Sequence, residues 1–245
     1  MQKLTIIGPG RLGRTISACL SIPHKLVGKN QEIPRSDIYL LTVPDRVIST
    51  ICKQIPTGGV VLHTSGAQSH EILRPHHPAG VFHPLMTFPG PEISIPNQHV
   101  PVRISGDDTA CEAAKWLAKE LQYKAFLFEG SEEQYHCAAV LAGNCGSLLL
   151  HLAGTIMSQD NRMTIDEAQR QLLPLMMQSI QNTAKDGIFQ SLTGPIVRGD
   201  EETMNTHRRE LMSFSPYILR TYNILMESLM CIYQKKEAEK NQEKD

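Results

Sequence analysis

Short apolar runs of strand length recur through the first half of the chain and alternate with segments of helix length. Residues 38–43 (IYLLTV) and 60–63 (VVLH) are continuous apolar runs, as is typical of parallel strands covered on both faces. The same pattern predicts further strands at residues 4–7, 25–27, 80–82, 100–104 and 125–128, and helices at 11–20, 45–54 and 107–121. This alternation predicts a Rossmann-type, doubly wound α/β sheet in a first domain, residues 1–130.

The pattern changes after residue 130, where long helical segments follow one another with few strand-like runs between them. Helices are predicted at residues 132–158, 165–186, 201–212 and 216–234. We therefore expect a second, all-helical domain over residues 131–245. Its last stretch, residues 235–245 (KKEAEKNQEKD), is highly charged and is expected to be a solvated helix end or a flexible tail.

A glycine motif lies between the first predicted strand and the first predicted helix. The sequence GPGRLG at residues 8–13 matches G-x-G-x-x-G, and its position between strand and helix is the context that this motif requires. Gly8 permits the tight turn, Gly10 lets the backbone approach a pyrophosphate, and Gly13 lets the helix pack close to the strand. Unpaired N–H groups at the start of the helix favour phosphate. We expect this turn to bind a dinucleotide through Gly8, Pro9, Gly10, Arg11, Leu12 and Gly13.

The residues after the second predicted strand favour NADP over NAD. An NAD-binding domain usually carries an acidic residue at the tip of this strand, for the ribose hydroxyls. Here the strand is followed by GKN at residues 28–30, and Glu32 lies past the tip. Arg11, Arg14 and Lys29 are candidates to face a 2′-phosphate, although Arg11 is also compatible with a solvated side chain at the helix start.

Three further loops follow strands at the edge of the sheet where ligands bind in this fold class. The first, TVPD at residues 42–45, offers Val43 and Pro44 as lining of a dinucleotide site. The second, HTSGA at residues 63–67, offers hydroxyls and backbone N–H groups from Thr64, Ser65 and Gly66. The third, FHPLMTF at residues 82–88, carries His83, which either faces the substrate or caps the strand end.

The apolar run at residues 135–157 is long enough to span a bilayer. It also contains His136, Asn144 and His151, with glycines between them, and amphipathic helices follow it, so we predict a helix of a soluble protein. With regular α-helical spacing, Asn144, Ser147 and His151 share one face, and His136 is rotated by about 80° from Asn144 and lies ~12 Å away along the axis. The two are therefore predicted to contact opposite ends of one ligand.

Composition narrows the function further. The formal net charge is −1, which does not favour a nucleic-acid-binding surface. The six cysteines form no CxxC pair, and no signal-peptide pattern opens the sequence, so reduced thiols in a cytoplasmic protein are expected. The spacing of the histidines fits no compact metal motif, so no metal site is predicted.

A second polar cluster lies at residues 192–211 (LTGPIVRGDEETMNTHRREL). Thr193 is in a predicted turn, and Asp200 is a predicted helix N-cap. The planar guanidinium of Arg198 suits a substrate carboxylate. The alternative is that Arg198 pairs with Asp200 to brace the loop. His207 follows on the next helix, and histidine is a residue type suited to proton transfer near neutral pH.

In order along the chain, GPGRLG, HTSGA, FHPLMTF, YHCAAVLAGN, LLPLM and LTGPIVRGDEETMNTHRREL resemble the Rossmann-like and DUF2520 domain proteins. That family is similar to the wider group of 6-phosphogluconate-dehydrogenase-like reductases. The resemblance implies an NADPH-dependent reductase of a small 2-oxo acid, with ketopantoate, the precursor of pantoate in pantothenate synthesis, as the favoured substrate. It also implies a homodimer paired through the helical domain, which would then bind substrate as well.

One position departs from the pattern of these relatives. Many of them carry a lysine four residues before the asparagine of the long helix, whereas Val140 stands here. His136 is then the expected proton donor, with His207 as the other candidate, and Asn144 is expected to hold the substrate oxygen. Two alternatives remain, namely an imine reductase of the pyrroline-5-carboxylate type and a protein that binds NADP without turnover.

Overall fold

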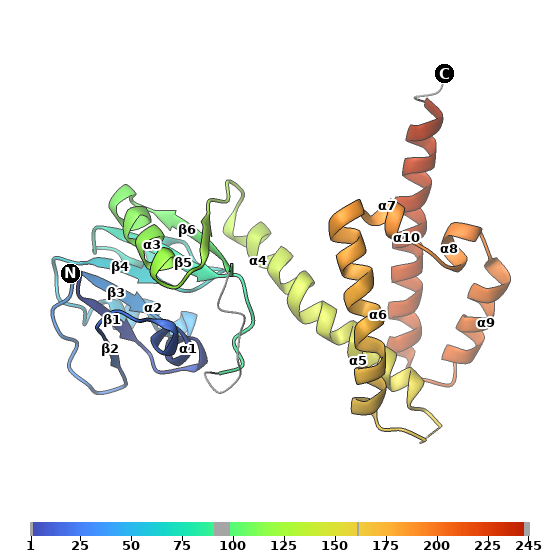
Figure 1. Ribbon diagram of the computed structural model, residues 1–245, viewed down its shortest axis with the longest axis horizontal. Coiled ribbons are helices and arrows are strands. Elements are labelled where there is room, and N and C mark those ends of the chain that lie inside the picture. Colours follow the sequence, from blue (N-terminus) through green and yellow to red (C-terminus); the bar gives the residue numbers. More distant parts are fainter. Residues whose placement is uncertain (1, 91–98, 161, 243–245) are drawn as a thin grey trace. The chain divides into compact units, whose positions relative to one another are not determined.

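The computed structural model describes residues 2–90, 99–160 and 162–242, with side chains to residue 235, and it divides into two compact units (Figure 1). The first unit is Met1–Gly143 and the second is Asn144–Asp245. The sequence places the boundary earlier, at residue 130. Residues 131–143 form the start of the long helix, and they contact the first unit more than the second.

A seven-stranded sheet forms the centre of the first unit, in the order β2-β1-β3-β4-β5-β6-β7. The strands are β1 (Leu4–Ile7), β2 (His24–Val27), β3 (Ile38–Leu41), β4 (Val60–His63), β5 (Ala79–Pro84), β6 (Pro101–Gly106) and β7 (Lys124–Phe126). All neighbours are parallel except β5 and β6, which are antiparallel. The predicted Rossmann-type sheet is confirmed, and the reversal at β6 is the feature that strand lengths alone did not indicate.

Two hydrophobic clusters cover the two faces of the sheet. One packs α1 (Arg11–Cys19) and α3 (Asp108–Glu120) against alternate strand residues such as Ile6, Leu40 and Phe82, with Trp116 of α3 partly buried against it. The other packs α2 (Ile48–Cys52) against Leu41 and Val61. The short 3-10 helices η1 (Asp45–Val47) and η2 (His70–Leu73) adjoin α2. Burial on both sides explains why the central strands are apolar throughout.

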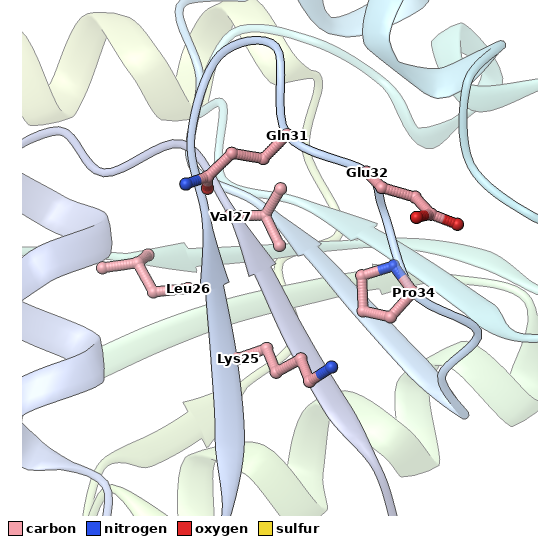
Figure 2. A pocket seen from close by; sticks show the side chains of 6 residues that line it. All are labelled: Lys25, Leu26, Val27, Gln31, Glu32 and Pro34. Carbon is pink, nitrogen blue, oxygen red and sulfur yellow. The ribbon is translucent and has the colours of Figure 1, made fainter.

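The edge strand β2 returns to β3 through a loop without a helix, and a shallow hollow of about 560 Å³ lies beside it (Figure 2). The side chains that line it are Lys25, Leu26, Val27, Gln31, Glu32 and Pro34. Gly28 N–H donates to Oε1 of Gln31 at 2.6 Å, so the carboxamide closes the turn directly after the strand. Glu32 lies in this loop beyond β2, as the sequence indicates.

The rest of the chain is helical, as predicted. The helices are α4 (Glu132–Val140), the π-helical segment η3 (Leu141–Cys145), α5 (Gly146–Met157), α6 (Ile165–Asp186), α7 (Ile188–Ser191), α8 (Pro195–Arg198), α9 (Glu201–Leu211) and α10 (Pro216–Gln242). The helix α10 continues into the charged stretch that begins at residue 235, and residues 243–245 lie outside the described part. The short helices α7 and α8 were not predicted, because four residues show no periodicity.

Small residues allow α5 and α6 to pack closely. A Cβ at Gly154 would lie 2.8 Å from Cγ of Gln169 and 3.3 Å from the Ile165 carbonyl oxygen. Gly154 is therefore required by helix packing. Gly143 differs, because a Cβ there would meet nothing within 4 Å.

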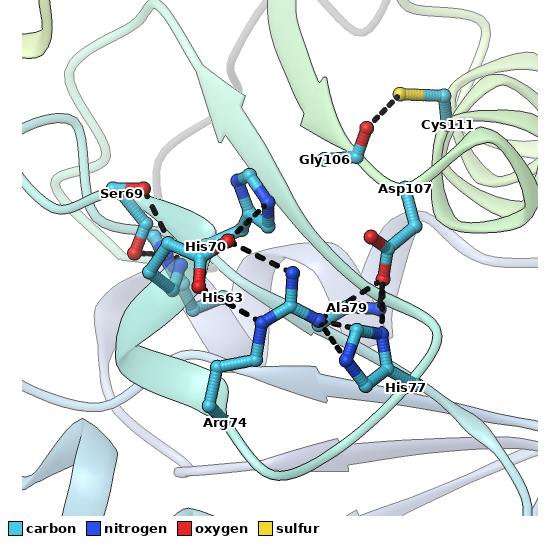
Figure 3. A network of polar contacts seen from close by, with 10 residues as sticks. His63, Ser69, His70, Arg74, His77, Ala79, Gly106, Asp107 and Cys111 are labelled. Carbon is cyan, nitrogen blue, oxygen red and sulfur yellow. Dashed lines mark hydrogen bonds and ion pairs between the residues drawn. The ribbon is translucent and has the colours of Figure 1, made fainter.

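Asp107 fastens the start of α3 to the start of β5 (Figure 3). It occupies the N-cap position of α3, but its carboxylate caps no N–H of that helix. Oδ2 instead accepts from Ala79 N–H at 2.8 Å and from His77 Nδ1 at 3.2 Å, and lies 3.5 Å from the Arg74 guanidinium. The pKa of Asp107 is held below its usual range. The hydrogen bond from Ala79 N–H has the largest effect, and His77 and Arg74 add smaller ones.

Asp107→Ala should lower the melting temperature by roughly 3–6 °C at pH 7, because hydrogen bonds to an ionised carboxylate are lost. The folded pKa lies below the unfolded value of about 3.9, so the stabilisation is present above that pH and is lost as the pH falls through the folded pKa. Calorimetry from pH 7 down to pH 3 measures both effects. Asp108→Ala removes the same charge from an exposed position and is the control. Equal melting temperatures for the two variants at pH 7 would contradict this role of Asp107.

Candidate functional site

The glycine turn at residues 8–13 lies where β1 is followed by α1, beside the end of β3. Gly8 has φ +112°, and a Cβ on it would lie 2.6 Å from the Thr42 carbonyl oxygen and 2.8 Å from Cγ1 of Val43. A Cβ at Gly13 would lie 2.1 Å from the Gly8 carbonyl oxygen. Both positions therefore require glycine for reasons internal to the protein.

Gly10 differs from its two neighbours in the motif. It is the N-cap residue of α1, and a Cβ there would meet only the Thr42 carbonyl oxygen, at 3.9 Å. No side chain caps the first turn of α1, so its N–H groups point outward without a side-chain partner. Arg11 is exposed, whereas Leu12 packs against the core and offers only its backbone. The space above Gly10 and the uncapped helix start are the combination that binds phosphate.

Thr42, which was not predicted as a site residue, holds this turn in place. Its hydroxyl lies 2.7 Å from the Gly8 carbonyl oxygen and 3.2 Å from that of Ile7, and it donates to this pair of acceptors. Thr42 therefore braces the turn from β3, and Val43 and Pro44 follow it at the same edge of the sheet. A hydroxyl directly after an apolar parallel strand is the sequence signal that points to such a brace.

The hydroxyls of the 63–67 loop are engaged within the protein. Thr64 Oγ1 donates to the Leu41 carbonyl at 3.0 Å. Ser65 Oγ donates to Asp45 at 2.8 Å and accepts from the N–H groups of Ala67 and Gln68 at 3.1 and 3.2 Å. These hydroxyls, which the sequence offers to a ligand, shape the loop instead.

His63 is a structural residue of this loop. It is fully buried, its Nδ1 accepts from Ser65 N–H at 3.2 Å, and its Nε2 lies 3.2 Å from the Ser69 carbonyl. Burial lowers the pKa of His63 to about 4, against the smaller opposing effect of the Ser69 bond. An uncharged ring with its proton on Nε2 satisfies both contacts.

A buried polar cluster at the end of β5 was not predicted. His83 Nδ1 and the Tyr135 hydroxyl of α4 are 2.7 Å apart. The Arg103 guanidinium of β6 lies over the Tyr135 ring, 4.7 Å from its centroid, and donates to Glu132 at 2.6 Å. The Arg103 side chain is 2% exposed, so Glu132 and the aromatic ring compensate a buried charge. These contacts dock the first turns of α4 on the sheet.

The long apolar helix differs from the regular one that was predicted. The segment η3 is π-helical and contains Asn144, so the α-helical spacing used to relate His136 to Asn144 does not hold through it. That geometric prediction was wrong. His136, Val140 and Asn144 are all exposed. His136 follows Tyr135 directly and lies near enough to His83 to disfavour its protonation.

The second polar cluster lies within the helical unit. Asp200 is the N-cap of α9, and accepts from Thr203 N–H at 3.0 Å, as predicted. Arg198 ends α8 and is exposed, and in the described part of the chain it makes no close salt bridge with Asp200, although its charge favours the Asp200 carboxylate. Thr193 is exposed, and His207 Nδ1 is 2.9 Å from the Tyr222 hydroxyl.

Residues Glu132–Met157 are long and apolar enough to cross a membrane, by length and composition alone, and few of them are buried within the chain. The helix belongs to a fold that other proteins of known structure share, as the comparisons below show. All six cysteines lie in the described part and none forms a disulfide. Among the described residues, no group of three or more metal-ligating side chains comes together.

Several crystal structures share this fold over nearly the whole chain. Protein TM1727 from Thermotoga maritima is 24% identical, with a TM-score of 0.76 over 96% of this chain and 99% of that one. A candidate NADP oxidoreductase from Bacteroides fragilis is 19% identical, with a TM-score of 0.75 over 94% and 98%. The 1-pyrroline-5-carboxylate reductase of Streptococcus pyogenes is 14% identical, with a TM-score of 0.59 over 94% and 98%. The chain therefore shares its fold with these proteins, two of which are described as an oxidoreductase and a reductase.

The family model described as domain of unknown function DUF2520 matches residues 100–229, which is more than half of the chain. The chain therefore belongs to the DUF2520 family, as the sequence motifs indicate. A search of curated proteins finds no significant match to this sequence.

Gly13→Ala should destabilise the protein by about 3 kcal/mol or more, because a methyl group cannot fit 2.1 Å from the Gly8 carbonyl oxygen. Gly10→Ala adds the same methyl group in open space and should change the free energy of unfolding by no more than about 1 kcal/mol. Urea unfolding followed by circular dichroism compares the two. Equal destabilisation by both variants would show that the space above Gly10 is filled in the folded protein.

Proposed function

We propose that this protein is an NADPH-dependent reductase of a small carboxylate substrate. The observation that carries the proposal is the glycine turn, in which Gly8 and Gly13 are required by internal contacts while Gly10 leaves open space beside an uncapped helix start. The fold shared with NADP-binding oxidoreductases supports this class of activity.

The residues present fit a dinucleotide. The N–H groups of residues 10–13 hold the pyrophosphate, and Pro9, Val43, Pro44 and the backbone at residues 64–66 line its path. The preference for NADP rests on the residues after β2. Gly28 and Lys29 stand there in place of a carboxylate, and the Gln31 carboxamide already bonds Gly28 N–H. The exposed Arg11 and Lys29 are available to a 2′-phosphate. A neighbour from Plasmodium falciparum, a pyrroline carboxylate reductase, has NADP bound, which supports this preference.

NADPH, when bound, supplies the hydride, and the protein orients and polarises the substrate. We assign the substrate-binding role to His83, Thr193, Arg198 and His207. Arg198 pairs with the substrate carboxylate and Thr193 adds a hydrogen bond. Asn144 donates to the substrate oxygen from the π-helical segment, a distortion common at functional sites. His136 supplies the proton, because Val140 has no acidic hydrogen to give.

The favoured substrate is a 2-oxo acid, and ketopantoate is the leading candidate on the family resemblance. A specific observation favours a second candidate, an imine of the pyrroline-5-carboxylate type. Pyrroline-5-carboxylate reductases and imine reductases share the fold at TM-scores of 0.54–0.59. A protonated imine arrives already charged, so an enzyme with Val140 in place of lysine would need no strong acid to reduce it.

NADPH oxidation followed by absorbance, with ketopantoate and pyrroline-5-carboxylate side by side and NADH in parallel, tests the function. We expect turnover of one of the two with NADPH preferred over NADH. Gly10→Ala, which keeps the fold, should raise the dissociation constant for NADPH at least about tenfold, since its methyl group occupies the phosphate site. NADPH binding without oxidation of either substrate would favour a cofactor-sensing protein over a reductase.

The same assay tests His136. His136→Ala should lower kcat for a 2-oxo acid by about 10²–10⁴-fold, as expected for loss of a general acid. The neighbouring Cys137→Ala is the matched control, because Cys137 is also exposed on α4 and has no assigned role. Full turnover by His136→Ala at every pH would remove His136 from the mechanism.

We also propose that the helical unit pairs with a second copy of the chain, in the cytoplasm. Leu173, Met177 and Ile180 follow one another at helical spacing along α6 and are 41%, 51% and 58% exposed. Leu148 and Leu149 of α5, which packs against α6, are also exposed. Several large apolar side chains exposed on two neighbouring helices are typical of an interaction site.

Sedimentation velocity at micromolar concentration should give twice the 27.3 kDa mass of the chain. Ile180→Asp should shift the protein to the monomer, because it places a charge in the apolar contact. Gln171→Asp places the same charge on the side of α6 opposite Ile180, about two and a half turns away, and should leave the dimer intact. A monomeric wild-type protein at this concentration would exclude the proposed pairing.

A further inference from the structure

His83 is held on two sides at the end of β5. Its Nδ1 meets the Tyr135 hydroxyl at 2.7 Å, and the two rings are edge to face, with centroids 5.4 Å apart. On the other side, the ring edge that carries Nε2 lies against Gly66. A Cβ added to Gly66 would be only 2.9 Å from His83 Nε2. Gly66 thus leaves room for the imidazole, and the ring has one defined orientation beside the 63–67 loop.

The hydrogen bond between His83 and Tyr135 fixes where the ring proton resides. Tyr135 is 5% exposed, and His83 Nδ1 is the hydrogen-bond partner of its hydroxyl among the described residues. If Nδ1 carried the proton, the buried phenol O–H would have no acceptor there, which costs free energy. The phenol therefore donates to Nδ1, and the ring proton lies on Nε2.

The surroundings keep this ring uncharged. Burial foremost, and then the neighbouring Arg103 and His136 side chains, lower the pKa of His83 to about 4, against a smaller opposing effect of Asp45. The buried Arg103 cannot move away, because it is bound to Glu132 and stacked on Tyr135. Near neutral pH, His83 is therefore a neutral imidazole that can donate from Nε2 but does not act as a strong acid.

Tyr135 is itself held rigidly. The Arg103 guanidinium covers its ring, and Phe126 and Phe128 contact it with centroids 6.5 and 5.7 Å away. The first turn of α4 is fixed by a capping box between Ser131 and Gln134. Such rigidity suits a residue that orients another side chain.

We propose that Tyr135 is a positioning residue that fixes His83 as an uncharged Nε2–H donor to a carbonyl oxygen of the bound ligand. Nε2 has no acceptor among the described residues, and it lies at the carboxyl edge of the parallel sheet beside the loop that we assign to the cofactor. The acceptor is either the carboxamide oxygen of the nicotinamide or an oxygen of the substrate. This proposal rests on the proposed reductase function.

The full-length protein, labelled with ¹⁵N-histidine, allows the tautomer of His83 to be read by long-range ¹H–¹⁵N correlation, with His83→Gln to assign the signals. In the wild type, Nε2 should carry the proton and Nδ1 should show the shift of a hydrogen-bonded acceptor. In Tyr135→Phe, the ring should become a mixture of tautomers. Tyr123→Phe is the matched control, since the Tyr123 hydroxyl is equally buried but has no partner in the described part, and it should leave His83 unchanged.

Ligand addition then identifies the acceptor. A downfield shift of the His83 Nε2–H on addition of NADP⁺ alone identifies the carboxamide, and a shift that requires ketopantoate as well identifies the substrate. Tyr135→Phe should weaken binding of the responding ligand about 3- to 10-fold.

The proposal would be overturned if NADP⁺ and ketopantoate bind, as seen at other resonances, but the His83 signals do not respond. A wild-type Nδ1–H tautomer would also overturn it. Absence of any binding would instead show that the proposed function is wrong, and the ligand role of His83 would fall with it.

Discussion

The arrangement around the candidate site depends on one buried charge. Arg103 projects from β6 into a region where its side chain is 2% exposed, and an unpaired cation there would be strongly unfavourable. The Glu132 carboxylate neutralises this charge, and the ring of Tyr135 covers it. Both residues belong to the first turns of α4, so these turns must lie against Arg103. The need to compensate Arg103 therefore decides where α4 meets the sheet. Tyr135 is brought to His83, and His136 to the same edge, as consequences of that docking.

Much of the fold could be predicted, because it depends on patterns that are local in the sequence. Uninterrupted apolar runs such as 38–41 identify buried parallel strands, and GPGRLG identifies the first turn. The antiparallel direction of β6 could not be read in this way, since strand direction depends on the path of the chain between β5 and β6. The π-helical segment was missed because no residue pattern separates it from an α-helix, since the distortion lies in the register of the backbone hydrogen bonds.

Residues of the candidate site could be predicted where only one residue type fits, for a single physical reason. Gly8 and Gly13 are needed for conformation and close approach, and the contacts around them explain both. Hydroxyls were harder to interpret, because the same groups that suit a ligand also suit a loop. Thr64 and Ser65 are used by the loop. Pairs distant in sequence, such as His83 with Tyr135 and Arg103 with Glu132, gave no local signal, since neither partner is unusual without the other.

The tryptophan content offers a way to observe the two units separately. The chain has one tryptophan, Trp116, which is partly buried against the core of the first unit, and the second unit has none. Intrinsic fluorescence excited at the indole band therefore reports melting of the Rossmann-type unit alone. Far-ultraviolet circular dichroism, by contrast, is dominated by the helices of the second unit. Comparing the two signals in one denaturant titration shows whether the units unfold together or in separate steps, without any label being added.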